Sequence, residues 1–215
     1  MSAEHVAGRT GTDAAEGGAT DGRVARRHVT RQRIVEAHAA LLREGDLQPT
    51  AAVVAARAGV SVRALWTNFK DVEGLRAATT DYWIGADEEL VEPVDPSASL
   101  DERIDRFCAQ RQLRLERLAP AVRSSMIALH RSPELVRSRQ LHITRLRHEL
   151  ERLFARELGA APDRDELLRS LMLAASWTSW LLLRDDLGAD VEGAGATIRR
   201  TLHALLTERP APTAR

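Results

Sequence analysis

The stretch TAAVVAARAGVSVRALWTNFK, residues 50–70, decides the fold that the sequence predicts. It predicts a short helix that begins after Thr50, a three-residue break over residues 58–60, and a further short helix that Ser61 caps. Gly59 stands in the break, where a residue with positive φ is needed to stop the first of the two helices. Two short helices joined by a turn that contains glycine define a helix-turn-helix.

The side chains of this motif divide into an inward and an outward set. Val54, Val60 and Leu65 are expected to point inward, and Ala55 to lie where the two helices cross. The outward residues of the second helix would then be available to a DNA major groove; they are Val62, Arg63, Trp66 and Thr67. Many helical proteins contain the same spacing without binding DNA, so the motif needs support from the rest of the chain.

The distribution of charge gives that support. The 215 residues carry 31 basic and 31 acidic side chains, and a net charge of zero by itself argues against a nucleic-acid protein. Residues 1–22 sum to −3, residues 23–70 to +6 and residues 71–215 to −3. A local charge of +6 can release counterions from DNA. The arginines of residues 23–33 are either a basic arm that follows DNA or a solvated entry to the first helix.

The motif and its flanks resemble the signature of the TetR/AcrR family of bacterial transcriptional regulators. The resemblance covers residues 31–75, and its matching positions are Val54-Ala55, Ala58-Gly59-Val60-Ser61, Leu65-Trp66, Phe69, Glu73 and Leu75, with Arg33-Ile34-Val35-Glu36-Ala37 upstream. Val72 stands where the family often has a lysine that meets a phosphate, and Lys70 is the candidate replacement. On this resemblance Thr50, Trp66, Asn68 and Lys70 would contact phosphates, whereas Ser61, Val62, Arg63 and Thr67 would face base edges.

The resemblance also implies an architecture. The expected fold is all-α, with an N-terminal three-helix DNA-binding domain and a larger C-terminal helical domain for effector binding and dimerisation. We divide the chain into a disordered leader (1–22), the helix-turn-helix domain (23–70), a connecting helix (71–93) and the C-terminal domain (94–209). The expected helices span residues 30–43, 50–57, 61–67, 72–90, 100–118, 121–130, 134–158, 163–187 and 195–206, with a loose tail at 210–215.

A homodimer is expected, because one recognition helix covers too few base pairs to specify a site. Trp177 and Trp180 share a face that Leu173 and Arg184 extend, and this face would pair in a four-helix bundle with the partner. The alternative is that both tryptophans pack inside one subunit. The resemblance further implies a small-molecule effector, and its candidate contacts are Phe107, Cys108, Met126, His130, His142 and Trp177.

Composition limits the other classes of protein. Cys108 is the only cysteine, which excludes a disulfide scaffold and a cysteine-rich zinc site and favours a cytoplasmic protein. The longest apolar run, between Arg169 and Arg184, has fourteen residues and is too short to span a membrane. No catalytic motif, cofactor or metal site is expected, although an all-helical enzyme and a helical adaptor without sequence-specific DNA binding remain the alternatives.

Overall fold

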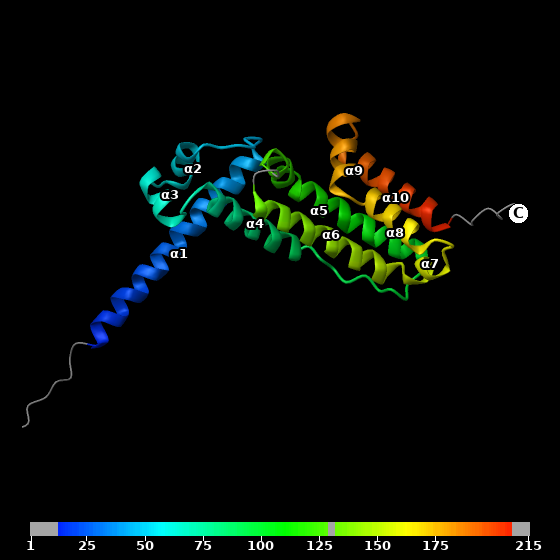
Figure 1. The fold of residues 1–215 in the computed structure, drawn as a ribbon, viewed down its shortest axis with the longest axis horizontal. Helices are drawn as coiled ribbons and strands as arrows, with labels where there is room; N and C mark the ends of the chain where they lie inside the picture. Colours follow the sequence, from blue (N-terminus) through cyan, green and yellow to red (C-terminus); the bar gives the residue numbers. More distant parts are fainter. Residues whose placement is uncertain (1–12, 129–131, 208–215) are drawn as a thin grey trace, which may run out of the picture.

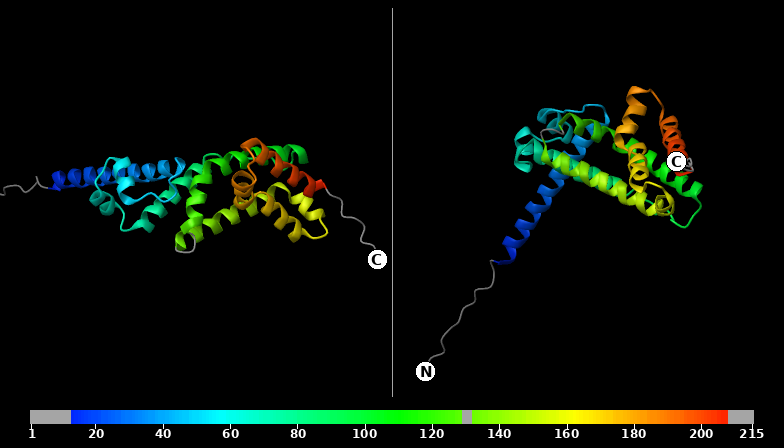
Figure 2. Two further views of the ribbon diagram at one scale, coloured as in Figure 1. Left: turned by 90° about the horizontal axis from the view of Figure 1, so that it is seen from above. Right: turned by 45° about the vertical axis from the view of Figure 1, so that its right-hand side comes forward.

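The computed structural model describes residues 13–128 and 132–207, and throughout these ranges the regular structure is helical. The headpiece helices are α1 (Asp13–Arg43), α2 (Ala51–Ala58), α3 (Val62–Asn68) and α4 (Val72–Glu88). The remainder is built from α5 (Leu100–Ala128), α6 (Pro133–Leu153), α7 (Ala155–Ala160), α8 (Arg164–Ala174), α9 (Trp177–Leu181), the π-helical turn η2 (Leu182–Asp186) and α10 (Val191–Thr207). Figures 1 and 2 show an elongated molecule with α1–α4 at one end.

The helix-turn-helix forms as the sequence predicts, and its boundaries follow local capping signals. Thr50 caps α2 and Ser61 caps α3, each through a side-chain oxygen that accepts a hydrogen bond from a backbone N–H three residues on. Gly59 ends α2 with φ +65°, in the left-handed region. Asp71 caps α4 in the same way as Ser61 caps α3.

A small hydrophobic cluster holds the headpiece together. Val54 and Leu65 are fully buried in one cluster with Ile34 of α1, and Ala55 of α2 is buried in the same cluster. Val60 is half-buried and packs against the same cluster. The inward set predicted for residues 54–65 is therefore confirmed.

The first helix begins much earlier than predicted. We expected it to start at Thr30 after a disordered leader, whereas α1 extends back to Asp13 and projects away from the body of the molecule (Figure 1). Residues 13–22 contain no proline and carry Asp13 and Glu16 in the first turn, where negative charge favours a helix. Residues 1–12 lie outside the described part of the chain.

The C-terminal part corrects several predicted boundaries. The predicted helices at 100–118 and 121–130 are one helix, because α5 continues through Pro120. The predicted helix at 134–158 divides at Phe154, and the one at 163–187 divides into α8, α9 and η2. The last helix begins at Val191, four residues before the predicted start. The predicted tail at 210–215 lies outside the described residues.

At two of these breaks a buried arginine of α5 donates a hydrogen bond to a carbonyl oxygen at the helix end. Arg103 donates from Nη1 to the carbonyl of Leu153, immediately before the break at Phe154. Arg111 donates from Nε to the carbonyl of Ala175 at 2.8 Å, where α8 gives way to α9. Each guanidinium satisfies a carbonyl oxygen at a helix end, so side chains distant in sequence stabilise both breaks. At the second break Ser176 also caps α9 by accepting a hydrogen bond from the N–H of Ser179.

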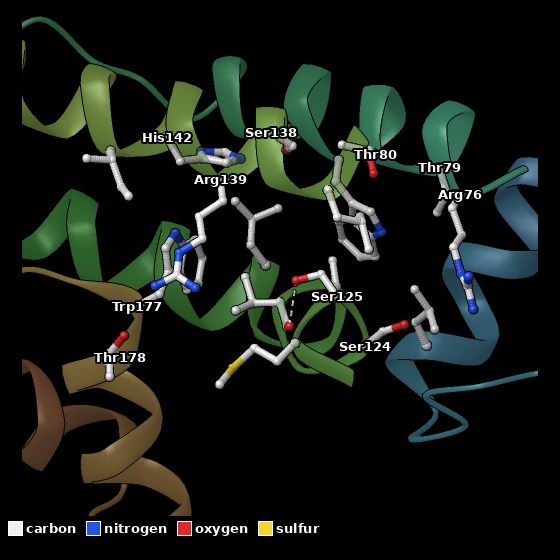
Figure 3. A pocket seen from close by; sticks show the side chains of 18 of the residues that line it. Arg76, Thr79, Thr80, Ser124, Ser125, Ser138, Arg139, His142, Trp177 and Thr178 are labelled. Atoms are coloured by element: carbon white, nitrogen blue, oxygen red, sulfur yellow. Dashed lines mark hydrogen bonds between the residues drawn. The ribbon is translucent and has the colours of Figure 1, made fainter. Parts of the chain in front are cut away.

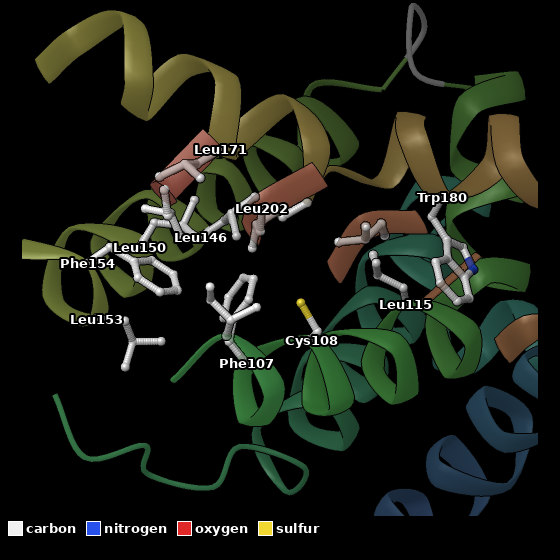
Figure 4. Packing of buried hydrophobic residues seen from close by; sticks show 14 of the residues in the cluster. Phe107, Cys108, Leu115, Leu146, Leu150, Leu153, Phe154, Leu171, Trp180 and Leu202 are labelled. Carbon is white, nitrogen blue, oxygen red and sulfur yellow. The ribbon is translucent and has the colours of Figure 1, made fainter. Parts of the chain in front are cut away.

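The main hydrophobic core lies among α5, α6, α8 and α10 (Figure 4). Phe107 and Phe154 pack edge to face with their ring centroids 6.1 Å apart. Trp180 is fully buried at the other end of this core, and its indole Nε1–H donates to Glu116 at 3.2 Å. This core anchors α5, the long helix that also contacts the headpiece through α1 and α4.

Candidate functional site

Helix α3 presents an exposed edge, on which Ser61 accepts from the N–H of Ala64 and the Thr67 hydroxyl donates to the carbonyl of Arg63. Ser61, Val62, Arg63 and Thr67 are all exposed, as the sequence predicts for residues that would face a major groove. The side chain of Arg63 takes part in no ion pair recorded between residues 24 and 207. The edge thus combines one unneutralised guanidinium with an apolar valine and two hydroxyl groups, a set of groups that can contact base edges.

Several of the predicted phosphate contacts already make local hydrogen bonds. The Thr50 hydroxyl oxygen accepts from the N–H of Val53 at 3.4 Å, and the Asn68 Nδ2 donates to the carbonyl of Ala64 at 2.8 Å. Asn68 Oδ1 is buried and has no partner among the described residues. A phosphate accepts hydrogen bonds, so only the Nδ2 group of Asn68 could donate to it. Because Nδ2 already donates to Ala64, this side chain is poorly placed for a phosphate contact.

Trp66, Lys70 and Val72 differ in how far they reach solvent. Trp66 is half-buried and packs against the headpiece cluster. Lys70 is exposed in the turn after α3, and Val72 is exposed at the first position of α4. The structure therefore offers a solvent-facing ammonium group two residues before the position at which the family signature has its lysine.

Three other arginines of the basic segment brace the headpiece. Arg31 donates to the carbonyl of Asn68 at 2.9 Å, and its guanidinium lies 4.2 Å from the centroid of the Phe69 ring. Arg33 donates to the carbonyl of Ala58 at 2.7 Å, while Arg57 pairs with Glu44. The sequence predicted that the arginines of residues 23–33 either follow DNA as a basic arm or are solvated at the entry to the first helix. Arg31 and Arg33 do neither alone, because each hydrogen-bonds a carbonyl of the helix-turn-helix and so helps to position it.

A cavity of about 400 Å³ lies where the headpiece meets the C-terminal helices. Its walls come from α1 and α4 on one side and from α5, α6 and the start of α9 on the other. Figure 3 shows Arg76, Thr79 and Thr80 toward one end, and His142, Trp177 and Thr178 toward the other. A volume of this size is typical of small-molecule sites in proteins.

At the headpiece end, a buried hydrogen bond joins α1 to α4. His38 Nδ1 lies 2.9 Å from Thr79 Oγ1, and the Thr79 hydroxyl donates to the carbonyl of Leu75 at 2.9 Å. The Thr79 oxygen therefore accepts from Nδ1–H of His38, which fixes the tautomer of a neutral imidazole. Burial, assisted by the charge of Arg76, lowers the pKa of His38 to about 4.

At the opposite end, Arg111 and His142 face the cavity. The guanidinium of Arg111 lies 5.8 Å from the centroid of the Trp177 ring. Burial, followed by the neighbouring charge of Arg114, lowers the pKa of Arg111 to about 10, so the group is still a cation at neutral pH. Burial also lowers the pKa of His142, which favours its neutral form.

The six predicted effector contacts fall into three groups. Met126, His142 and Trp177 line the cavity. Phe107 and Cys108 lie instead in the main core, where burial raises the pKa of the Cys108 thiol to about 12. His130 lies outside the described residues.

Sequence reasoning missed the charged and hydroxylated wall of the cavity. The signal for Arg111 was present, because it recurs at helical spacing with the apolar residues Phe107, Leu115 and Leu118 on the buried face of α5. A charged residue at an apolar position of a helical period indicates a buried, functional or paired side chain. The hydroxyl residues Thr79, Ser124, Ser125 and Ser138 gave no such signal.

The tryptophan face predicted for dimerisation is divided between two roles. Trp180 packs inside the subunit and Trp177 lines the cavity, whereas Leu173 is two-thirds exposed. Arg184 pairs with Glu116 of α5 at 3.1 Å. Packing within one subunit therefore describes Trp180, whereas Trp177 is half-buried beside the cavity. The large apolar side chains exposed between residues 173 and 187 are Leu173, Leu182 and Leu187.

Comparison with solved structures identifies the fold. A transcriptional regulator from Rhodococcus sp. RHA1 superposes with a TM-score of 0.62 at 17% identity, covering 82% of this chain and 95% of its own. A TetR transcription regulator from Haloarcula marismortui gives 0.62 at 19% identity, with coverage of 83% and 97%. The multidrug binding protein EbrR, solved with imidazole, gives 0.59 at 22% identity, with coverage of 88% and 95%.

The chain therefore has the fold of TetR-type transcriptional regulators, with an N-terminal helix-turn-helix and a helical C-terminal domain. No protein-family model and no curated protein matches its sequence. Among the helices described, none is both long and apolar enough to span a membrane.

Proposed function

We propose that this protein is a cytoplasmic, ligand-responsive transcriptional regulator that binds a palindromic operator as a homodimer and represses transcription until a small molecule releases it. The observation that carries this proposal is the capped helix α3, whose outer edge exposes Arg63 beside Val62 and Thr67. The TetR-type fold supports the same assignment. An adaptor that lacks sequence-specific DNA binding is the principal alternative.

In the proposed complex α3 enters the major groove with its N-terminal end foremost. Ser61, Val62, Arg63 and Thr67 face base edges, and Arg63 is the candidate for bidentate contact with guanine. Thr50 and Lys70 contact phosphates of the DNA backbone that flank the groove, and the indole N–H of Trp66 donates to another phosphate. Asn68 is assigned to the same phosphate set, but its hydrogen bond to Ala64 makes it the weakest member.

The proposed dimer places the C-terminal helices of two subunits together. Leu173 at the end of α8, Leu182 in η2 and Leu187 after it are each about half to two-thirds exposed. Large apolar side chains exposed to this degree are candidates for burial by a partner subunit. Two subunits would then present two recognition helices to the two halves of an operator.

The proposed effector acts through the cavity, because its walls belong to both parts of the molecule. His38, Thr79 and Trp83 come from the headpiece helices, while Arg111 and Trp177 come from the C-terminal helices. A ligand that fits one relative placement of these helices better than another shifts the population toward that placement. EbrR, one of the structures with this fold, is described as a multidrug binding protein.

The test is selection of DNA fragments from the source genome by the full-length protein, followed by fluorescence anisotropy with the selected fragment. We expect saturable binding that unlabelled selected DNA displaces and random DNA of equal length does not. Arg137→Ala is the control for loss of an arginine from the protein surface, because Arg137 is exposed on α6 outside the headpiece. It should bind the selected fragment as the unsubstituted protein does, whereas Arg63→Ala should bind it more weakly. Absence of binding, or binding without preference for the selected fragment, overturns the proposal in favour of an adaptor. A reporter gene under the selected fragment then distinguishes repression from activation.

A further inference from the structure

We propose that the cavity binds an organic anion, namely a carboxylate with an apolar body, and that Arg111 is the side chain that holds the carboxylate. This inference rests on the proposed function, since it names the chemical class of the effector. It is argued from the charges, the hydrogen bonds and the apolar surfaces of the cavity wall.

The charged side chains of the wall are all basic. The described residues that line the cavity include Arg76, Arg111 and Arg139, but no aspartate and no glutamate. Of the three, Arg76 already pairs with Glu73 at 2.6 Å. Two guanidinium groups of the wall thus have no carboxylate partner from the described chain.

Of these two arginines, Arg111 has the greater need of an anionic partner, because it is buried. Its side chain is 6% exposed, and among the described residues its one recorded hydrogen bond runs from Nε to the carbonyl of Ala175. The nearest acids, Asp87 and Glu149, bind Arg114 instead, Asp87 at 2.8 and 3.0 Å and Glu149 at 3.3 Å. Transfer of a guanidinium out of water is costly unless an anion faces it, and a bound carboxylate would supply that anion.

The surrounding polar groups suit an anion better than a cation. The imidazoles of His38 and His142 are held neutral by burial, so they do not compete with Arg111 for the negative charge. The charges that the described wall carries are therefore those of its arginines, which attract a carboxylate and repel an ammonium group.

The remaining wall is apolar and accounts for the body of the ligand. Leu42 of α1, Leu118 of α5, and Leu135 and Leu146 of α6 line the cavity beside the aromatic rings of Trp83 and Trp177. The guanidinium of Arg111 lies 5.8 Å from the ring centroid of Trp177, and Figure 3 shows Trp177 at the same end of the cavity as His142. A ligand with its carboxylate at this end directs its apolar part toward Leu118 and Trp83, between the headpiece and α5.

The experiment uses three probes of equal chain length that differ in the head group: decanoate, decan-1-ol and decylamine. Each is titrated by calorimetry into the full-length protein below its aggregation concentration. We expect decanoate to bind at least about tenfold more tightly than the alcohol, the typical gain from one charge-assisted hydrogen-bonded pair. The amine is expected to bind most weakly.

Variants assign that preference to Arg111. Arg111→Met should bring decanoate to within about twofold of the alcohol, while Arg111→Lys should keep most of the preference because it keeps the charge. Arg106→Met is the matched control, because Arg106 lies on the same helix and is exposed with Glu102 as its partner. This control should bind decanoate as the unsubstituted protein does.

Equal binding of the three probes, preference for the amine, or no binding of any probe overturns the proposal. If Arg111→Met fails to fold, the three probes on the unsubstituted protein still test the anion preference, and Arg111→Gln, which removes the charge but keeps a polar side chain, tests whether Arg111 supplies it. DNA binding is measured separately without any probe. Decanoate preference without DNA binding rejects the proposed regulator alone, whereas DNA binding without an anion preference rejects this inference alone.

Discussion

His38 of α1 donates a buried hydrogen bond to Thr79 of α4, and the 2.9 Å contact forms part of the cavity wall. The two helices that carry these residues flank α2 and α3 in sequence and pack against each other. The bond therefore ties the placement of the helix-turn-helix to the shape of the cavity. Its dependence on a neutral imidazole makes it sensitive to pH.

We expect the free energy of unfolding to fall as the pH drops from about 6.5 to about 4. The pKa of His38 is about 4 in the folded protein and 6.5 unperturbed, so in this window the unfolded chain binds a proton that the folded protein does not. The full difference corresponds to about 3 kcal/mol. Urea unfolding of the protein and of His38→Gln across this range checks it. A stability difference between the two that does not change with pH would contradict the assignment.

Gly59→Ala should destabilise the protein by about 1–2 kcal/mol, since an L-residue at φ +65° is strained. The added Cβ would also lie 2.9 Å from Nη2 of Arg33, which must then leave the carbonyl of Ala58. Thermal unfolding measures the effect. Gly85→Ala is the control: Gly85 is helical and exposed with open space around its Cβ position, so this change should stabilise by about 0.5–1 kcal/mol. Equal effects of the two substitutions would refute the argument.

Arg63→Ala should weaken binding to the selected DNA fragment by roughly 1–3 kcal/mol and relax the preference at one position. The reason is that Arg63 is the exposed guanidinium of α3. Anisotropy with the selected fragment and with single-base variants of it provides the measurement. An equal loss on selected and random DNA would make Arg63 a phosphate contact instead.

Arg114→Met should destabilise the protein by about 3–5 kcal/mol, because it leaves the carboxylate of Asp87 buried without its partner. Burial by itself would raise the pKa of Asp87, but the hydrogen bonds and charge of Arg114 lower it overall. The double variant Arg114→Met with Asp87→Asn should recover part of the loss. Arg106→Met, which breaks an exposed pair with Glu102, should cost less than about 1 kcal/mol. Chemical denaturation compares the three, and a loss from Arg114→Met no larger than that from Arg106→Met would exclude a buried pair.

The headpiece could be predicted from the sequence because its signals are local. Thr50, Ser61 and Asp71 cap the helices that directly follow them, and Gly59 alone supplies the left-handed residue of the turn. The C-terminal breaks could not be predicted in this way. The carbonyl groups of Leu153 and Ala175 accept hydrogen bonds from arginines 50 and 64 residues away, which no local pattern indicates. Ser176 caps α9 directly after the second break, but a serine inside an apolar helical run is a weak signal without that distant contact.

The candidate site shows the same contrast. Residues of α3 could be placed on an exposed edge from helical spacing alone, and the structure exposes Arg63 and Thr67 as expected. The cavity is formed by five helices, so no single stretch of sequence describes its wall. Phe107 and Cys108 were wrongly predicted to contact the effector, because they lie in the main core. They stand about one helical turn before Arg111, which lines the cavity, and their residue types do not reveal this difference.

Lys70, the only lysine of the chain, lies exposed in the turn that follows α3. Thirty arginines supply every other side-chain cation apart from histidine. An amine-selective acylating reagent therefore has one side chain to modify, and that side chain adjoins the surface assigned to DNA. Mass spectrometry of the acylated protein can thus report the occupancy of this surface at a single lysine, without an engineered label.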